Sequence, residues 1–236
     1  MSDHHELARA SVAVGGSVAA GLRARPLRTT GKRAIDVVLA TSAMLVLLPV
    51  FLVATVLVRA TSRGPALFRQ TRVGREMRPF EMWKFRTMYE DNDDAIHREF
   101  VAGLRKDIPS DRVDGRDIYK LTHDPRITPV GRWLRRLSID ELPQLINVLL
   151  GTMSVVGPRP ALSWELELFG TLPRYPDRFA VKPGITGLWQ VSGRGMLTMR
   201  EAVALDAEYV DRRSFGLDLR ILLRTIPAVL SRRGAF

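Results

Sequence analysis

The strongest constraint in this sequence is an uncharged apolar stretch at residues 37–58. A helix of this length can cross the hydrocarbon core of a bilayer. Pro49 lies in the middle of the stretch. Proline has no backbone N–H and its ring clashes with the preceding turn, so it breaks or kinks the interior of a helix. The sequence therefore predicts a membrane helix that is broken at Pro49.

Both flanks of the apolar stretch are basic, and this bears on whether it crosses the membrane. Basic residues precede and follow it: Arg23, Arg25, Arg28, Lys32 and Arg33 before, and Arg59, Arg63, Arg69, Arg72, Arg75 and Arg78 after. A single crossing normally has its Lys and Arg residues concentrated on one side. We therefore expect a re-entrant helix at residues 31–60 that turns at Pro49 and returns to the same side. A spanning helix is the alternative.

Composition limits the function classes. The 236 residues carry a formal charge of +11, which indicates an anionic partner such as nucleic acid, an acidic membrane surface or a phosphorylated substrate. The absence of cysteine excludes disulfides, a thiolate nucleophile and a Cys-ligated metal. Residues 1–30 lack the continuous apolar core of a secretory signal, so we expect a mobile basic tail that can lie on anionic lipid.

Residues 61–236 are interpreted as one compact α+β domain that is mainly helical. Two extended runs, at residues 66–73 and 80–88, predict a short β-hairpin. The polar insertion at about residues 90–119 is expected to be a surface excursion, helical first and then a loop over DIPSDRVDGRD. The final helices are amphipathic and either pack in the core or lie in the membrane interface. One side of the last helix is expected to contain Leu217, Ile221, Leu222, Thr225 and Val229, with Arg220 and Arg224 beside them.

An adjacent acidic pair, Asp140-Glu141, lies among apolar residues of this basic chain. Neighbouring carboxylates are costly to bury unless they are compensated, here by Arg135 upstream or by a hard divalent cation. Pro143 is expected in the first turn of a helix that ends at Gly151, which places Asp140 near its N-cap. From the residues alone, Asp140 is either an ordinary helix cap or part of a site for phosphate and metal.

Two basic groups are candidates for phosphate binding. Arg132, Arg135 and Arg136 are spaced to cluster on a helix that starts at Pro129, where guanidinium groups could hold phosphate or face lipid headgroups. The segment KFRTM in the second strand is either a phosphate site or a solvated strand edge. The glycine-rich residues 182–194 could bring backbone N–H groups close to phosphate, although they form neither a P-loop nor a Rossmann loop.

Several motifs in a fixed order carry a family resemblance. SIDELPQLINVLLGTMSVVGPRP closely resembles the catalytic segment of the bacterial sugar transferases, the monotopic polyprenyl-phosphate phosphoglycosyl transferases. Other stretches match in the expected order: Lys32-Arg33 with Asp36, GPALFRQTRVG, KFRTM, DPRITPVGRWLR and PGITGLWQVSGR. The resemblance implies a re-entrant helix and a catalytic domain on the cytoplasmic face of the bacterial inner membrane. This family often has Ser before the proline, whereas this chain has Leu48.

The resemblance also implies a reaction. A sugar-1-phosphate would move from a UDP-sugar to polyprenyl phosphate, commonly undecaprenyl phosphate, with release of UMP, as a first step in exopolysaccharide, capsule or O-antigen assembly. Asp140 would be the nucleophile, forming an aspartyl-phosphosugar intermediate, and Glu141 its partner in metal or proton handling. Both would be ligands of Mg²⁺. The substrate-binding residues carried over are Arg135, Lys84, Arg86, Arg159 and Pro160.

Two other functions compete with this interpretation. A basic membrane-attached scaffold that binds anionic lipid or nucleic acid would explain the charge and the apolar stretch. It gives no reason for Asp-Glu-Leu-Pro beside an Arg cluster, and the sequence contains no nucleic-acid-binding motif. A glycosyl transferase that moves the sugar without its phosphate would release UDP instead of UMP.

Overall fold

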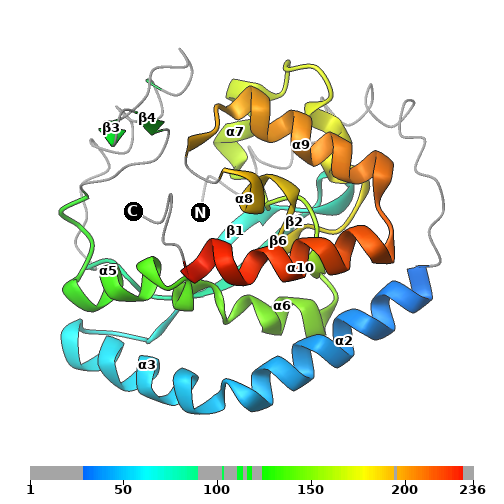
Figure 1. Ribbon diagram of the computed structural model, residues 1–236. Coiled ribbons are helices and arrows are strands. Elements are labelled where there is room, and N and C mark those ends of the chain that lie inside the picture. The colour runs from blue at the N-terminus through cyan, green and yellow to red at the C-terminus, as the bar shows by residue number, and fades with distance from the viewer. Residues whose placement is uncertain are drawn as a thin grey trace.

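The computed structural model describes residues 29–89, 103, 111–113, 116–118, 124–193 and 196–230. These residues are mainly helical, with small two-stranded sheets, as predicted (Figure 1). The predicted tail, except for its last two residues, and most of the insertion at about 90–119 lie outside the described residues.

The apolar stretch forms two helices, α2 (Thr29–Val46) and α3 (Leu48–Thr61). Among the described residues no single helix meets the length and hydropathy of a membrane span. Gly31–Val46 and Leu48–Thr61 meet them only as a pair, bent by 62°. Pro49 lies in the first turn of α3, where its missing N–H costs least. The predicted break is confirmed, and it falls at the residue between the two helices.

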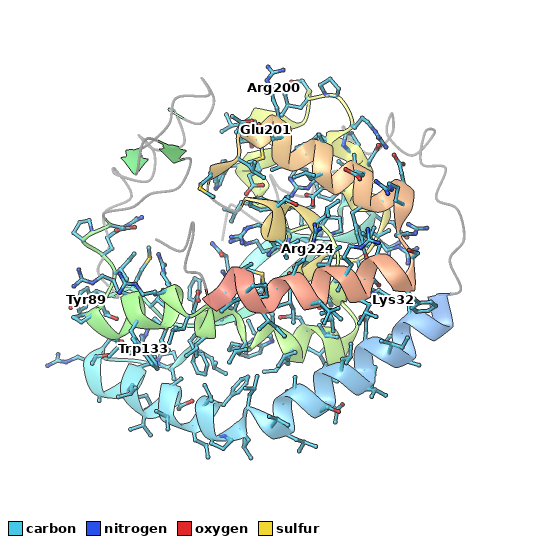
Figure 2. All side chains as sticks on the ribbon, in the orientation of Figure 1. Lys32, Tyr89, Trp133, Arg200, Glu201 and Arg224 are labelled. Atoms are coloured by element: carbon cyan, nitrogen blue, oxygen red, sulfur yellow. The ribbon has the colours of Figure 1, made fainter. Side chains whose placement is uncertain are left out.

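The helix pair has one face against the domain and one apolar face that is exposed. On the inner face Ala40, Ala54 and Val58 are buried against the hairpin and the helices that follow it. Side chains of the outer face point away from the domain along the lower edge in Figure 2. The exposed apolar residues of the pair include Val38, Leu45, Val46, Leu48, Leu52, Val53 and Val56. A contiguous apolar surface of this kind marks a site of interaction with protein or membrane.

The predicted hairpin is present. Strands β1 (Leu67–Val73) and β2 (Pro79–Phe85) pair antiparallel, joined by the short 3-10 turn η1 (Arg75–Met77). The second strand ends at Phe85, earlier than expected, and Met88 instead forms an isolated bridge with Ile127.

The segment after the insertion begins with α5 (Pro129–Arg136), whose start at Pro129 was predicted. The Thr128 hydroxyl caps it by accepting a hydrogen bond from the Gly131 N–H at 2.9 Å. The chain then passes through the 3-10 turn η2 (Ile139–Glu141) into α6 (Gln144–Leu150). These elements lie between the helix pair and the rest of the domain in Figure 1.

The glycine-rich residues 182–194, considered as a segment that could bring backbone N–H groups close to phosphate, contain a strand and a helix. They form strand β6 (Gly184–Thr186), which pairs in parallel with β5 (Ser154–Val156), and then helix α8 (Leu188–Ser192). A Cβ on Gly184 would lie 2.1 Å from the Gly157 nitrogen. These glycines therefore allow two backbone segments to meet, which leaves no room for a side chain between them.

The remaining elements belong to the C-terminal part of the chain. They are α7 (Ser163–Phe169), the 3-10 helix η3 (Tyr175–Ala180), α9 (Met199–Arg212) and α10 (Phe215–Leu230). The predicted face of α10 packs inward, with Ile221 fully buried, whereas Leu219, Leu223 and Ile226 on its other side are exposed.

The prediction of a loop over DIPSDRVDGRD is wrong in part. Strands β3 (Asp111–Val113) and β4 (Arg116–Ile118) form a short antiparallel ladder there. The intervening Asp-Gly sequence is a strong signal for a two-residue hairpin connection, and the loop prediction did not use it.

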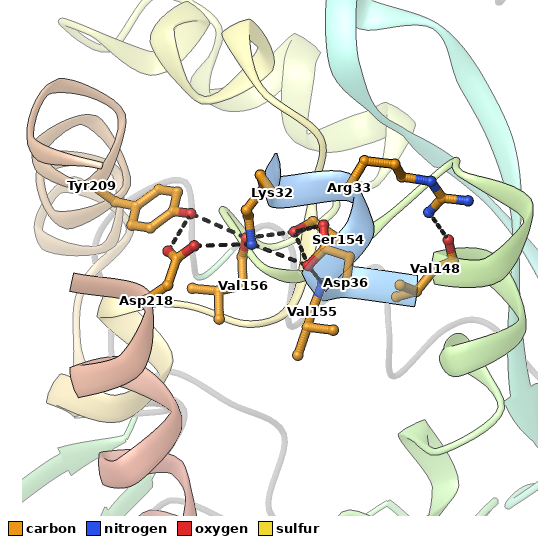
Figure 3. A network of polar contacts seen from close by, with 9 residues as sticks. All are labelled: Lys32, Arg33, Asp36, Val148, Ser154, Val155, Val156, Tyr209 and Asp218. Atoms are coloured by element: carbon orange, nitrogen blue, oxygen red, sulfur yellow. Dashed lines mark hydrogen bonds and ion pairs between the residues drawn. The ribbon is translucent and has the colours of Figure 1, made fainter. Parts of the chain in front are cut away.

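A buried polar network holds the start of α2 against the domain (Figure 3). The carboxylate of Asp36 accepts hydrogen bonds from the Ser154 hydroxyl at 2.8 Å and the Val155 N–H at 3.1 Å. Lys32 Nζ lies 3.1 Å from Asp36 and 3.0 Å from Asp218. The network connects α2 to both β5 and α10, so the helix pair and the domain form one packed unit.

We expect Asp36→Ala to destabilise the protein by about 3–5 kcal/mol, because the Val155 N–H loses its acceptor and half-buried Lys32 keeps only Asp218 as a carboxylate partner. The measurement is denaturant unfolding in detergent micelles, followed by circular dichroism. Asp177→Ala is the matched control, because Asp177 forms only a surface ion pair with Arg174 at 2.7 Å and should cost less than about 1 kcal/mol. Equal losses for the two variants would contradict the assigned role of Asp36.

Candidate active site

The acidic pair lies in a turn between two helices and not at a helix N-cap. Ser138 adopts the left-handed conformation, with φ of 55°, and turns the chain sharply after α5. Asp140 and Glu141 then belong to η2, and the N-cap position of α6 is Pro143. The predicted placement of Asp140 near the N-cap of α6 is therefore wrong, because an additional 3-10 turn separates it from the helix. Asp140 is 8% exposed.

The side chain of Glu141 faces a polar pocket. Its Oε1 lies 3.3 Å from Lys84 Nζ and 3.6 Å from Arg159 Nη1. The charged and amide side chains that line the pocket are Arg72, Lys84, Glu141, Gln144, Arg159 and Gln190. Pro160 lines another part of the wall. Of the predicted residues, the structure thus brings Lys84, Glu141, Arg159 and Pro160 together.

Arg72 belongs to the pocket, although the sequence interpretation treated it only as a flanking basic residue. Its Nη1 donates to the Pro160 carbonyl at 3.2 Å, and its Nη2 donates to Gln70 Oε1 at 2.7 Å. The hairpin register pairs Arg72 with Phe80 and Gln70 with Met82, so Arg72 and Lys84 point to the same face. The alternation within LFRQTRV indicates that Arg72 and Gln70 lie on the same face of the strand. Only the hairpin register shows that Lys84 lies on that face too.

Burial shifts the pKa values of the pocket cations. Desolvation, together with a smaller effect of Arg159 nearby, lowers the pKa of Arg72 to about 10. Desolvation also lowers the pKa of Lys84, while the carboxylates of Glu141 and Asp140 oppose that shift. The charged forms of these side chains therefore depend on nearby negative charge, and a bound anion would stabilise them further.

Arg135 is not among the residues that line this pocket. Its Nε donates to the Thr87 hydroxyl at 2.9 Å. Burial lowers its pKa, and the Asp140 carboxylate is the largest influence in the opposite direction. Arg135 is therefore placed to compensate Asp140, whereas Arg132 and Arg136 are exposed and do not share its surroundings.

Arg86 does not line the pocket. Its guanidinium lies at the end of α3, where a Cβ on Gly64 would approach Nη1 to 2.4 Å. Its Nη2 lies 3.5 Å from the Ser62 carbonyl oxygen. Its position near α3 gives no support to the predicted contact with substrate.

Two buried polar contacts fix the pocket walls. Asn147 of α6 accepts a hydrogen bond from the Trp83 N–H at 2.9 Å and donates to the Glu81 carbonyl at 2.7 Å. These bonds fix the acidic segment relative to the strand that carries Lys84. On the opposite wall, Arg178 donates to the Arg159 carbonyl at 3.1 Å.

Arg178 is itself held by a buried ion pair. Its Nη2 lies 2.8 Å from Oδ2 of Asp206, which is fully buried at 0% exposure. Burial raises the pKa of Asp206 to about 7, while the Arg178 charge acts in the opposite direction. This pair supports the main chain of Arg159 from beneath the pocket.

The protein ligands available for a metal are few. Within the described ranges, no group of three or more His, Cys, Asp or Glu side chains could hold an ion. Asp140 and Glu141 supply two adjacent carboxylates. This donor set fits an oxygen-seeking ion that takes its other ligands from water and from a bound phosphate.

Comparisons with known proteins agree with the sequence resemblance. The family described as "Bacterial sugar transferase" matches residues 27–232. The chain is 42% identical over 212 residues to the exopolysaccharide production protein ExoY of Sinorhizobium fredii, covering 90% of this chain and 91% of that protein.

Two further relatives have names that specify a reaction. The UDP-glucose:undecaprenyl-phosphate glucose-1-phosphate transferase of Caulobacter vibrioides is 40% identical over 212 residues, which cover 87% of this chain and 72% of that protein. The undecaprenyl-phosphate galactose phosphotransferase of Salmonella typhimurium is 44% identical over 177 residues, which cover 73% of this chain and 35% of that protein.

We expect Arg72→Met and Lys84→Met each to weaken binding of inorganic pyrophosphate by about tenfold or more, because each removes a charge-assisted contact from a poorly solvated pocket. Isothermal titration calorimetry in detergent measures the change. Arg132→Met is the control, since it removes the same charge from an exposed position. A similar loss in Arg132→Met would show that the overall positive charge, and not the pocket, binds the anion.

Proposed function

The chain belongs to the bacterial sugar transferase family, and from this we propose that it moves a sugar-1-phosphate from a UDP-sugar to polyprenyl phosphate, releasing UMP. The names of two relatives specify sugar phosphate transfer involving undecaprenyl phosphate, which supports this reaction class. The name of ExoY supports a place in exopolysaccharide production.

The observation that carries the proposal is the acidic pair beside three cationic side chains. Arg72, Lys84 and Arg159 line one pocket with Glu141. A UDP-sugar carries a diphosphate, and such a cluster of partly desolvated cations suits it well. A scaffold that binds anionic surfaces would have no use for cations enclosed in a pocket with a carboxylate.

The proposed chemistry has two displacements at one phosphorus. In the first, an Asp140 carboxylate oxygen attacks the β-phosphorus of the donor, and the bond from that phosphorus to the oxygen bridging to UMP breaks. UMP leaves with that oxygen and its electron pair. The sugar phosphate is then held on Asp140 as an aspartyl phosphate.

In the second displacement, an oxygen of polyprenyl phosphate attacks the same phosphorus. The bond to Asp140 breaks, which regenerates its carboxylate and leaves a polyprenyl diphosphate sugar. Arg135, Lys84 and Arg159 compensate the phosphoryl charge throughout. Glu141 acts in metal or proton handling, and it lies in contact with Lys84 and Arg159 beside the nucleophile.

We propose Mg²⁺ as the cofactor, held by Asp140 and Glu141 together with oxygens of the donor diphosphate and water. Mg²⁺ commonly binds through one or two carboxylates plus substrate phosphates, which agrees with a donor set of this size. When bound, the ion would offset the diphosphate charge and so favour departure of UMP.

We further propose that α2 and α3 form a re-entrant element in the cytoplasmic face of the bacterial inner membrane. Three observations support this: the 62° bend, the apolar outer face and the basic residues on both flanks. This placement would hold the acidic pair at the depth of a lipid phosphate, so the acceptor need not leave the bilayer.

Asp140→Asn tests the nucleophile, because the amide keeps the shape of the side chain but cannot attack phosphorus. We expect the variant to stay folded and to lose activity by about 10³-fold or more. The measurement is UMP release from UDP-glucose or UDP-galactose with polyprenyl phosphate and magnesium, and chelator should abolish it. Wild type given donor alone should release about one UMP per active enzyme and carry a phosphosugar on the Asp140 peptide.

Asp177→Asn, a change at an exposed carboxylate, is the control and should retain full activity. Near-normal turnover by Asp140→Asn would remove the nucleophile assignment. Release of UDP would instead indicate glycosyl transfer, and release of neither nucleotide would favour a scaffold.

Single cysteines test the topology without interference, since the chain has none of its own. If the helix pair is re-entrant, cysteines at Arg23 and at exposed Arg78 both lie in the cytoplasm. Both should resist a membrane-impermeant thiol reagent in intact cells and react after lysis. Pro49→Leu should favour a crossing, because it restores an unbroken helix. Labelling of Arg23→Cys from outside intact cells, in a chain that keeps Pro49, would refute the re-entrant arrangement.

A further inference from the structure

The pocket contains two carboxamides for which the proposed chemistry gives no role. Gln144 enters it from the start of α6, and Gln190 enters from α8. Both lie beside the cations that would hold the diphosphate. Neither was singled out by the sequence motifs as a functional residue.

Gln144 is buried but has no polar partner. Gln144 is only 3% exposed, and it lines the pocket. In the described part of the chain it makes no hydrogen bond. The Gln144 amide is not one of the fully enclosed polar atoms that lack a partner, so it opens onto the pocket, where a ligand can supply its hydrogen bonds.

Gln190 shows what kind of group the ligand must offer. Its Nε2 donates to the Ile185 carbonyl at 3.0 Å, which fixes the orientation of the amide. Its Oε1 is buried and has no hydrogen-bond partner among the described residues. This oxygen can only accept, and an ionised phosphate has no hydrogen to donate. The matching ligand group therefore carries an O–H or N–H.

The lining of the pocket favours hydroxyl groups over a nucleobase. Nucleobases are commonly held by stacking on aromatic side chains, and the described lining contains no aromatic residue. Each end of the diphosphate in a UDP-sugar carries a sugar, the hexose through its anomeric oxygen and the ribose through its 5′ oxygen. Its hydroxyls both donate and accept, as two carboxamides require.

We propose that Gln144 and Gln190 form a subsite that binds hydroxyl groups of a sugar ring attached to the donor diphosphate. This inference rests on the proposed function, because it takes the pocket cations to hold that diphosphate. The ring is either the transferred hexose or the ribose of uridine, and the two share the same chemistry. The subsite would help to align the reacting phosphorus with Asp140.

The test compares binding of UDP-glucose, UDP-galactose and UMP to Gln144→Met and Gln190→Met. Asp140→Asn serves as the background so that the donor is not consumed, and calorimetry in detergent gives each Kd. The UDP-sugar with the lowest Kd for the background protein serves as the reference ligand. We expect each Met variant to raise the Kd of this ligand about tenfold. UMP binding that is unchanged assigns the subsite to the hexose, and an equal loss for UMP assigns it to the ribose.

Stability measurements separate this role from a structural one. Gln144→Met replaces an unpartnered buried amide with an apolar side chain of similar shape, so the unfolding temperature without ligand should stay the same or rise. A purely structural glutamine would show a lower unfolding temperature and unchanged Kd. Thr71→Val is the control, a polar-to-apolar change on the opposite face of β1 that should alter no Kd.

Binding within twofold of the background for all three ligands in both Met variants would overturn the subsite. Failure of the proposed function looks different. In that case the wild-type protein would release no UMP from any UDP-sugar, although the calorimetry would still report whether Gln144 and Gln190 contact the nucleotide sugar.

Discussion

Glu141 lies between Lys84 and Arg159 in a pocket that also encloses Arg72, and the surrounding fold has to make this arrangement tolerable. Burial disfavours the charged form of each cation, as the lowered pKa values of Arg72 and Lys84 indicate. The carboxylates beside them offset part of that cost. The remaining imbalance is positive, so a bound diphosphate would complete the site. Weak solvation also strengthens every contact with such a ligand.

The scaffold holds this pocket from several directions. Asn147 joins α6 to β2, and Arg178 with Asp206 supports the main chain of Arg159. Arg33 of α2 donates to the carbonyls of Val148 and Leu149 at the end of α6. The apolar helix pair is thereby connected to the helix that follows the acidic pair. This connection explains how an element suited to a membrane surface can fix the position of a catalytic segment.

Much of the local structure could be predicted because it depends on single residues and short patterns. Pro49 and Pro129 each lie in the first turn of a helix, where the missing N–H of proline costs least. The alternating runs around GPALFRQTRVG gave the hairpin. The predictions were wrong where the sequence pattern was equally compatible with another local structure. Asp140 entered a separate 3-10 turn, and the residues of DIPSDRVDGRD that are described pair as strands.

The sequence by itself determined the chemistry that is available: an apolar stretch with a central break, an excess of cations, and an acidic pair within recognisable family motifs. Only the tertiary structure decided which of these groups meet. Arg72 and Lys84 share a face through strand register, while Arg86, two residues from Lys84, packs against Gly64 at the end of α3. Gln144 and Gln190 line the same pocket although they are far apart in the chain. The physical reason is that burial and pKa depend on what surrounds a side chain in space, and sequence spacing does not specify those surroundings.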